Sequence, residues 1–410
     1  KDMARRAVKN YYIPGGKAPD EPYAAIPLHK IVGSKKLHEL CIIGNFVEVF
    51  LAREGHDRPV GINYLEKIQL PHLPSVYGAM LAGAAYVIMG AGIPTMIPGV
   101  LDGLANHEAV SYGLHVVSEN NGDKTLALFD PRAFREGDHP ALERPKFLPI
   151  IASNVLATTM LRRSNGTVDG FVIEGPTAGG HNAPPRGKLE VNERGEPVYG
   201  TRDVVDLGKI RDLGLPYWIA GGSASAARLT EVLDGGGSGI QVGTAFALCD
   251  ESGMAEQYRK DLLQEAIAGS ADVITDRLAS PTGFPFKVAQ LGGSLSEHDV
   301  YESRTRVCDL GYLREVYRKD DGGLGYRCSS EPVDIYVAKG GDAAETIGRK
   351  CICNSLVSNA GHPQIQKDGS TERPLLTCGD DLAEIARFVP EGKTSYTACD
   401  VIEKLLGPGA

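Results

Sequence analysis

The chain has 410 residues, which is long enough for two or three domains around a large core. Its hydrophobic content of 42% is ordinary for a soluble globular protein, and its net charge of −9 argues against a nucleic-acid partner. These totals predict a soluble globular protein without a nucleic-acid partner.

Residues 73–101 form a long uncharged stretch of the kind that can suggest a membrane span. Glycines and prolines interrupt the stretch repeatedly, so a helix followed by a buried strand fits better, and we expect no membrane contact. The sequence has eight cysteines and no recognisable secretory segment. Together these features predict reduced thiols and a cytoplasmic location.

Strand and helix patterns alternate about six times between residues 59 and 268, which is typical of a parallel α/β architecture. The predicted strands are short apolar runs at 59–64, 85–89, 147–152, 168–174, 216–220 and 238–242. The predicted helices cover 1–12, 37–54, 73–82, 154–163, 204–213, 224–233 and 253–268. Two inserted β-hairpins are also predicted. One pairs 114–117 with 125–129 across an Asn-Gly turn, and the other spans 188–200.

The most informative stretch is 168–182, where a buried strand leads into a glycine-rich loop that ends in a histidine. Gly179 and Gly180 lack a Cβ atom, so their backbone can lie close to a flat ligand. His181 follows directly, and an imidazole at the carboxyl end of a strand can exchange protons near neutral pH. The alternative is a glycine turn with a surface histidine. The strand–helix alternation weighs against it, because in such folds the carboxyl ends of the strands carry the site.

Two later loops have the composition of phosphate-binding turns. Gly221, Gly222 and Ser223 follow one strand and precede a helix, whose free N–H groups would face an anion. Gly243 and Thr244 follow the next strand and offer bare backbone and a hydroxyl group. Either loop alone could be an ordinary turn, but the two in succession favour a phosphate site. A Walker lysine motif and a Rossmann GxGxxG are both absent, which argues against an NTPase or a dinucleotide-binding domain.

The runs GPTAGGHN, AGGS and QVGTAF, in this order, resemble the nitronate monooxygenase (2-nitropropane dioxygenase) family. FMN-dependent enoyl-ACP reductases are similar to that family in their barrel and loops. GINY and MGAGIP also resemble the family's third and fourth strands, so the resemblance covers roughly residues 37–268. It implies an α/β fold of the TIM (β/α)8 type that binds FMN.

The resemblance implies a role for each residue of the predicted site. His181 matches the catalytic base of the family. The other matches concern FMN: Gly179 and Gly180 face the flavin, Gly221, Gly222, Ser223, Gly243 and Thr244 hold its phosphate, and Asn63 and Gly90 line its ring. No metal is implied.

The sequence also departs from the family. Thr177 stands where many relatives carry Glu, and the first two strands of the family barrel have no counterpart before residue 59. We therefore expect six strands of an incomplete barrel and infer that an N-terminal part of the natural protein is missing.

The activity implied by the resemblance is the oxidation of alkyl nitronates or nitroalkanes by oxygen. His181 would remove an acidic α-proton or orient the anion, and FMN would take an electron. An alternative keeps FMN but uses NAD(P)H to reduce an enoyl thioester, with an acyl carrier protein received near residues 188–200. A third hypothesis is a non-catalytic barrel that binds no flavin.

We divide the chain into an N-terminal helix and linker (1–36), an FMN-binding barrel (37–292) and an α+β extension (293–410). Six of the eight cysteines lie in the extension, but their spacing does not form two CxxC pairs, which favours scattered thiols over a metal site. Residues 279–288 are predicted to fold back on the barrel, and helices at 381–388 and 396–406 to pack on it. Thr397 and Asp400 have the spacing of a capping box.

Overall fold

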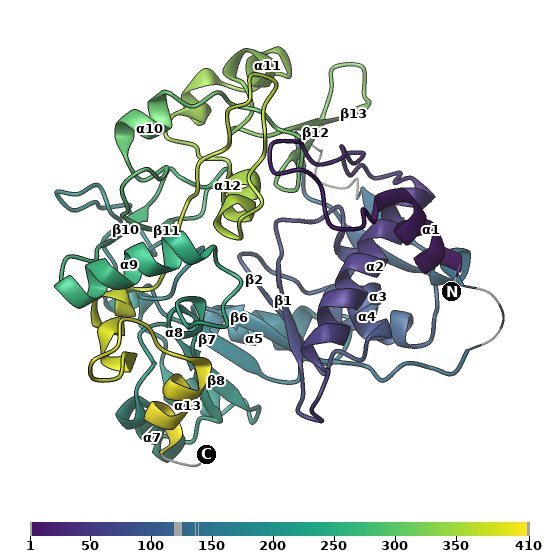
Figure 1. Cartoon of the computed structure of the whole chain (residues 1–410). Helices are drawn as coiled ribbons and strands as arrows, with labels where there is room; N and C mark the ends of the chain where they lie inside the picture. The colour runs from purple at the N-terminus through teal and green to yellow at the C-terminus, as the bar shows by residue number, and fades with distance from the viewer. Residues whose placement is uncertain (1, 119–124, 136, 138, 408–410) are drawn as a thin grey trace.

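The computed structural model describes residues 2–118, 125–135, 137 and 139–407. Its central feature is a parallel sheet of six strands, which lie side by side in the order in which they occur in the chain (Figure 1). The strands are β1 (Gly61–Leu65), β2 (Tyr86–Gly90), β6 (Lys146–Ile151), β7 (Phe171–Glu174), β8 (Tyr217–Ala220) and β9 (Gly239–Gln241). Each coincides with one of the six predicted strands, because a short apolar run buried on both faces is a strong signal.

The sheet is curled. Neighbouring strands lie about 4.8 Å apart, so six strands laid flat would separate the first from the last by about 24 Å. Asn63 of β1 and Gln241 of β9 nevertheless line the same pocket. The predicted fold class is confirmed as a mixed α/β half-barrel.

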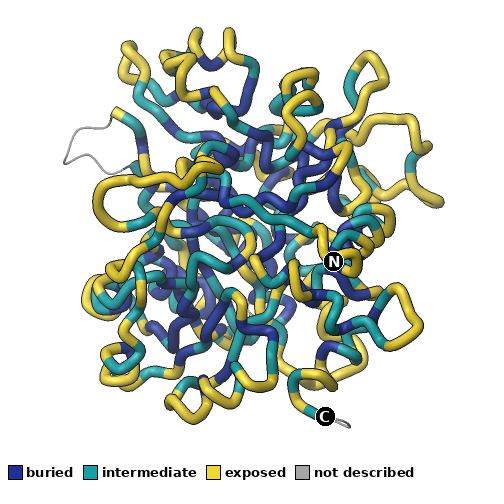
Figure 2. Tube along the Cα trace, turned by 90° about the vertical axis from the view of Figure 1, so that its left-hand side faces the viewer, coloured by how far each residue is buried: buried dark blue, intermediate teal, exposed yellow. Residues whose placement is uncertain are grey.

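Helices connect successive strands and bury the outer face of the sheet. They are α3 (His72–Leu81), α4 (Ile97–Ala105), α5 (Asn154–Arg163), α6 (Leu207–Arg211) and α7 (Ala226–Asp234), with α2 (Lys35–Ala52) packed on α3. α5 has the predicted bounds, because the Ser153 hydroxyl accepts a hydrogen bond from the Leu156 N–H and so caps its first turn. α6 is shorter than the predicted 204–213, because the 3-10 turn η2 (Thr201–Asp203) and an extended segment precede it. Figure 2 shows the buried residues in the interior and the exposed ones on peripheral loops.

One of the two predicted hairpins pairs differently. β5 (Leu126–Phe129) lies antiparallel to β3 (Val110–Gly113), so the prediction of 114–117 as its partner is wrong. β4 (Val116–Val117) pairs instead with β12 (Glu315–Arg318), which also pairs with β13 (Leu324–Arg327). Alternating residues indicate which face a strand buries but do not identify its partner. The predicted Asn-Gly turn at 120–122 lies outside the described residues.

The second predicted hairpin is confirmed as a short one. Val191 and Pro197 form an antiparallel bridge, and the Gly195 N–H donates a hydrogen bond to the Asn192 carbonyl oxygen. The hairpin is tied to the barrel by Tyr199, whose hydroxyl donates to the Ala183 carbonyl oxygen at 3.0 Å.

After β9 the chain forms α8 (Thr244–Ala247), α9 (Glu256–Ala268) and an antiparallel hairpin of β10 (Val273–Asp276) and β11 (Phe286–Ala289). Residues 279–288 do fold back on the barrel as predicted, since Phe286 forms an antiparallel bridge with His181. They form the connection and the first part of β11 instead of a plain loop.

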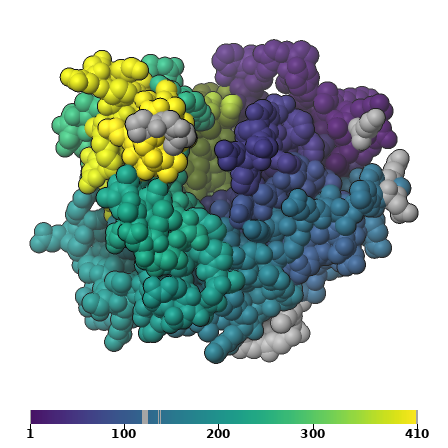
Figure 3. Space-filling view, turned by 90° about the horizontal axis from the view of Figure 1, so that it is seen from below, coloured from purple at the N-terminus to yellow at the C-terminus, as the bar shows by residue number. Residues whose placement is uncertain are grey.

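The last part of the chain packs beside the barrel. The 3-10 helix η4 (Asp380–Phe388) contacts α8 and α9, and α13 (Ala398–Leu406) contacts α7 and α8, as predicted for both segments. Figure 3 shows this C-terminal part, in yellow, against the teal middle of the chain. Thr397 and Asp400 form the predicted capping box at the start of α13.

The remaining elements are α1 (Asp2–Tyr11), η1 (Pro131–Phe134), α10 (His298–Glu302), α11 (Val333–Ala338), η3 (Ala343–Thr346) and α12 (Ile352–Asn359). The division into three domains stays a prediction. Within the described ranges, no helix is long and apolar enough to cross a membrane.

Candidate active site

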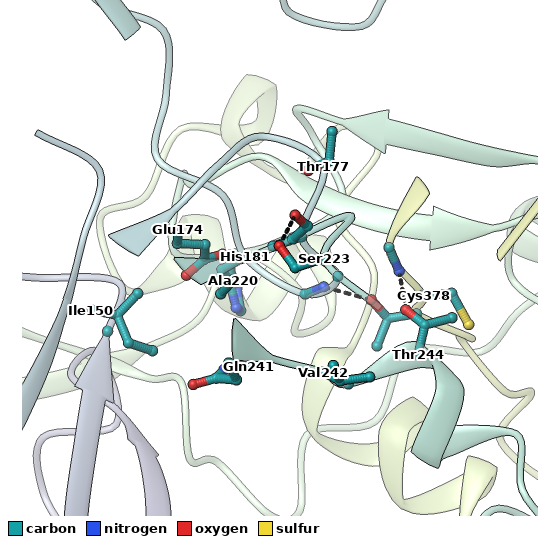
Figure 4. A pocket seen from close by; sticks show the side chains of 18 of the residues that line it. Ile150, Glu174, Thr177, His181, Ala220, Ser223, Gln241, Val242, Thr244 and Cys378 are labelled. Atoms are coloured by element: carbon teal, nitrogen blue, oxygen red, sulfur yellow. Dashed lines mark hydrogen bonds between the residues drawn. The ribbon is translucent and has the colours of Figure 1, made fainter. Parts of the chain in front are cut away.

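A pocket of about 480 Å³ lies at the carboxyl ends of the six parallel strands (Figure 4). Every residue predicted for the site lines it: Asn63, Gly90, Gly179, Gly180, His181, Gly221, Gly222, Ser223, Gly243 and Thr244. The β/α alternation explains this convergence, because every strand of a parallel sheet delivers its following loop to the same edge.

The glycines of the central loop are required for different reasons. Gly180 has a φ of +80°, and a Cβ there would meet nothing within 4 Å, so its backbone borders open space. A Cβ at Gly179 would lie 2.9 Å from the backbone of Cys378 and Gly379. The bare backbone at Gly179 therefore admits a neighbouring chain segment, whereas Gly180 is the one open to a ligand.

Two consecutive glycines with positive φ values shape the loop after β8. Gly221 and Gly222 have φ values of +87° and +57°, which residues other than glycine rarely adopt. The loop leads into α7, whose cap is Ser225, and the first N–H groups of a helix carry partial positive charge. Ser223 is buried, and its hydroxyl donates to the Gly221 carbonyl oxygen at 3.0 Å, so it holds the loop in shape.

The loop after β9 completes the same end of the pocket. A Cβ at Gly243 would meet nothing within 4 Å, so the absence of a side chain there leaves free space. The Thr244 hydroxyl accepts a hydrogen bond from the Gly379 N–H at 2.9 Å. This bond attaches a distant segment to the predicted phosphate site.

That distant segment, Thr377–Asp381, was missed by sequence reasoning. The Thr377 hydroxyl accepts a hydrogen bond from the Gly180 N–H at 2.9 Å, and the Asp380 N–H donates to the Thr177 carbonyl oxygen at 3.0 Å. Thr377, Cys378, Gly379 and Asp381 all line the pocket. The sequence signal was weak, because a Cys-Gly-Asp-Asp run nearly 200 residues beyond the glycine loop has no marked phosphate or flavin pattern.

The imidazole of His181 is held from one side. Its Nε2 lies 2.7 Å from the Ser280 Oγ, and its ring meets the Phe286 ring edge-on with centroids 4.8 Å apart. Burial lowers the pKa of His181 from 6.5 to about 4, so the ring is neutral at pH 7. No described residue bonds to Nδ1, which leaves this nitrogen as the ring atom that can meet a ligand.

Glu174, at the carboxyl end of β7, was not among the residues predicted for the site, yet its side chain lines the pocket with His181. Burial raises the pKa of Glu174 from 4.5 to about 8, although a hydrogen bond from Asn182 opposes the shift. Its carboxyl group is therefore mostly protonated at pH 7. A titratable group with such a shift in a pocket is a candidate functional group.

Asp381 is an acidic residue that lines the pocket together with the two predicted phosphate loops. Burial raises its pKa, while a hydrogen bond from Thr244 and the charge of Arg387 lower it. A carboxylate here would repel an anion, so this side chain works against phosphate binding in proportion to its ionisation.

The cysteines of the extension do not form a metal site among the described residues, in which no group of three or more His, Cys, Asp or Glu could hold an ion. All eight cysteines have free thiols. Burial raises the pKa of Cys351 to about 12 and that of Cys353 to about 11, so these two thiols stay protonated at neutral pH.

Residues 135–277 match the family model for nitronate monooxygenase. The chain is 38% identical over 117 residues to a nitronate monooxygenase of Pseudomonas aeruginosa, covering 28% of this chain and 32% of that protein. It is 35% identical over 184 residues to a nitronate monooxygenase of Paraburkholderia phytofirmans, covering 44% and 48%. The matches thus span about a third to a half of the length of these curated relatives. The family resemblance is confirmed on the segment that carries the Gly-Gly-His loop and both phosphate-type loops.

Two solved structures are similar in outline. FabK from Thermotoga maritima has a TM-score of 0.47 at 17% identity, over 88% of this chain and 79% of that one. Nitroalkane oxidase from Streptomyces ansochromogenes has a TM-score of 0.48 at 15% identity, over 89% and 84%. At these scores and identities neither likeness carries weight for function.

Proposed function

As a relative of the nitronate monooxygenases over residues 135–277, this chain is, we propose, an FMN-dependent oxidoreductase that oxidises alkyl nitronates and nitroalkanes with oxygen. The family match supports an oxidoreductase. The observation that carries the rest is that every residue assigned from the sequence lines one pocket, although these residues come from separate stretches between 63 and 244.

The residues present fit FMN. Gly243 leaves free space where a Cβ would stand, and Gly180 borders the same open pocket. The first turn of α7 and the loop Gly221–Ser223 would hold the phosphate through backbone N–H groups, and Thr244 lines the same end of the pocket. Only Asp381 opposes an anion among the described residues at this end, and its raised pKa weakens that opposition. When bound, FMN supplies the transfer of electrons from substrate to oxygen.

The side chains beside the proposed flavin suit an anionic substrate. At pH 7 both His181, with a pKa of about 4, and Glu174, with a pKa of about 8, are uncharged. A protonated carboxyl group donates a hydrogen bond to an anion without repelling it, and the neutral imidazole can donate or accept through Nδ1. A nitronate has already lost its α-proton, so its oxidation does not need proton removal by a weak base such as His181, whereas oxidation of a nitroalkane does. We therefore infer that nitronates are better substrates than nitroalkanes.

The test is to load the purified chain with FMN and record its visible spectrum, oxygen uptake with propyl-1-nitronate, and NADH consumption with an enoyl thioester. Flavin absorbance and nitronate-dependent oxygen uptake are expected. NADH consumption with the thioester and no oxygen uptake with nitronate would replace the proposal by the enoyl-thioester reductase alternative. A protein that takes up no FMN would point to the non-catalytic barrel.

His181→Ala is the matching variant, with the exposed His298→Ala as its control. The His181 variant should keep its flavin absorbance but lose roughly a hundredfold to ten-thousandfold in turnover of a nitroalkane, whose α-proton must be removed, because this is the usual contribution of a proton-transferring side chain. Turnover equal to that of the control would remove His181 from the mechanism.

A further inference from the structure

A second cavity, of about 360 Å³, adjoins the proposed flavin pocket. The two cavities share Ala91, Ile150, Glu174 and His181, so the proposed catalytic imidazole lies on the boundary between them. Ala91 has a φ of +55°, an uncommon conformation for a residue with a Cβ, and such strain often marks a functional site. A ligand in the second cavity would contact the same His181 that borders the flavin pocket.

The wall of this second cavity is largely apolar. Aliphatic and aromatic side chains line it, including Ile93, Ile151, Val155, Leu156 and Phe284. Ile151 is only 1% exposed, whereas Val155 is 73% exposed, so the cavity runs from a buried floor to an open rim. A cavity whose wall is largely apolar suits a hydrocarbon chain better than a sugar or a phosphate.

The rim carries one positive charge. Arg186 is the only Lys or Arg among the described residues that line this cavity. Its Nη1 donates to the Arg202 carbonyl oxygen at 2.9 Å and its Nη2 to the Ala152 carbonyl oxygen, which hold the guanidinium in place. No described carboxylate lies within ion-pair distance of it. Asp203 also lines this cavity, and its carboxylate accepts hydrogen bonds from the backbone N–H groups of Arg186 and Gly200 at 2.8 Å each.

From this arrangement we propose that the second cavity binds the hydrocarbon chain of the substrate, with the reacting group at His181 and an anionic group of the substrate at Arg186. The inference rests on the proposed function, because it identifies the class of nitronate that the site takes. It predicts a medium-length chain with a negative charge near its far end, in preference to a short neutral alkyl group.

Binding of decanoate, hexanoate and 1-decanol to the FMN-loaded protein, measured by calorimetry, tests the site without relying on turnover. Burying each methylene group should raise affinity about threefold to fourfold, so decanoate should bind far more tightly than hexanoate. Arg186→Gln should weaken the binding of decanoate about twofold to fivefold and leave the binding of 1-decanol unchanged, since an exposed ion pair contributes modestly. Equal affinity for decanoate and hexanoate would overturn the proposal, as would equal losses for decanoate and decanol.

Two exposed positions on α5 give a matched pair of variants. Val155→Trp fills the rim, whereas Leu161→Trp adds the same side chain outside the cavity. The Val155 variant should bind decanoate at least tenfold more weakly, whereas the Leu161 variant should bind it as the unchanged protein does. Ala183→Trp repeats the test at a second position that lines the cavity. Equal affinities in the Val155 and Leu161 variants would overturn the assignment.

Turnover separates this inference from the proposed function. If decanoate binds as described and competitively inhibits the oxidation of nitronates, the proposed function and the chain-binding cavity are both supported. If decanoate binds in this way but no nitronate is oxidised, the proposed function fails while the chain-binding cavity remains.

Discussion

The Nε2 atom of His181 lies 2.7 Å from the hydroxyl oxygen of Ser280, a residue 99 positions later that is fully buried. Ser280 in turn lies 2.8 Å from the Thr282 hydroxyl and accepts the Thr282 N–H at 3.2 Å. These contacts fix one nitrogen of the imidazole and leave Nδ1 for the pocket. They also allow either tautomer, because a hydroxyl group can donate to Nε2 or accept from it.

The first prediction follows from this contact. Ser280→Ala removes the group that orients His181, so kcat should fall about fivefold, as expected for losing a hydrogen bond of about 1 kcal/mol. Flavin absorbance should remain. Ser294→Ala is the control, because Ser294 is equally buried and its hydroxyl donates to the Leu291 carbonyl oxygen. Equal losses of kcat in the two variants would show that burial alone, and not the orientation of His181, matters.

A second prediction concerns the free space at Gly243. Gly243→Ala adds a methyl group where nothing lies within 4 Å, at an ordinary φ of −115°, so folding should be unaffected. The methyl group would occupy the proposed phosphate cradle and should raise the Kd for FMN at least about tenfold. Gly253→Ala is the matched control, since a Cβ there also meets nothing within 4 Å. Fluorescence titration with FMN measures the Kd of both variants. An unchanged Kd in the Gly243 variant would show that the phosphate binds elsewhere.

The raised pKa of Glu174 makes a third prediction, on pH dependence. Below its pKa of about 8 the carboxyl group is protonated and can donate to an anion; above it the carboxylate repels the anion. The kcat/KM for propyl-1-nitronate should therefore fall as pH rises through about 8. Glu174→Gln keeps a neutral donor and should lose this alkaline fall. The test is to measure kcat/KM for both proteins from about pH 6 to 9.5. The same alkaline fall in kcat/KM in both proteins would assign the fall to another group.

A fourth prediction concerns Asp381. Asp381→Asn removes a partial negative charge from the phosphate end of the pocket and should tighten FMN binding roughly fivefold, with the larger gain at higher pH, where Asp381 is more fully ionised. Glu384→Gln, on the same 3-10 helix and with a side chain 76% exposed, should change the Kd little. Weaker binding in the Asp381 variant would mean that the carboxylate accepts hydrogen bonds from the ligand instead of repelling it.

Local patterns in the sequence predict the six parallel strands, the bounds of α5 and the loops after the strands that line the pocket. Each of these is local. Short apolar runs form buried strands, Ser153 caps a helix, and the alternation of strand and helix sends every following loop to one edge. The positions of Gly179–His181 and Gly221–Ser223 in one pocket follow from that alternation alone.

The surroundings of those loops depend on tertiary packing. The pairing of β5 with β3, the wall formed by Thr377–Asp381, and the contact between His181 and Ser280 join residues whose relationship no local pattern encodes. The pKa values of Glu174 and His181 likewise depend on burial by segments far away in the chain. Local residue patterns specify helices, strands and turns, whereas burial and long-range contacts arise only when those elements pack together.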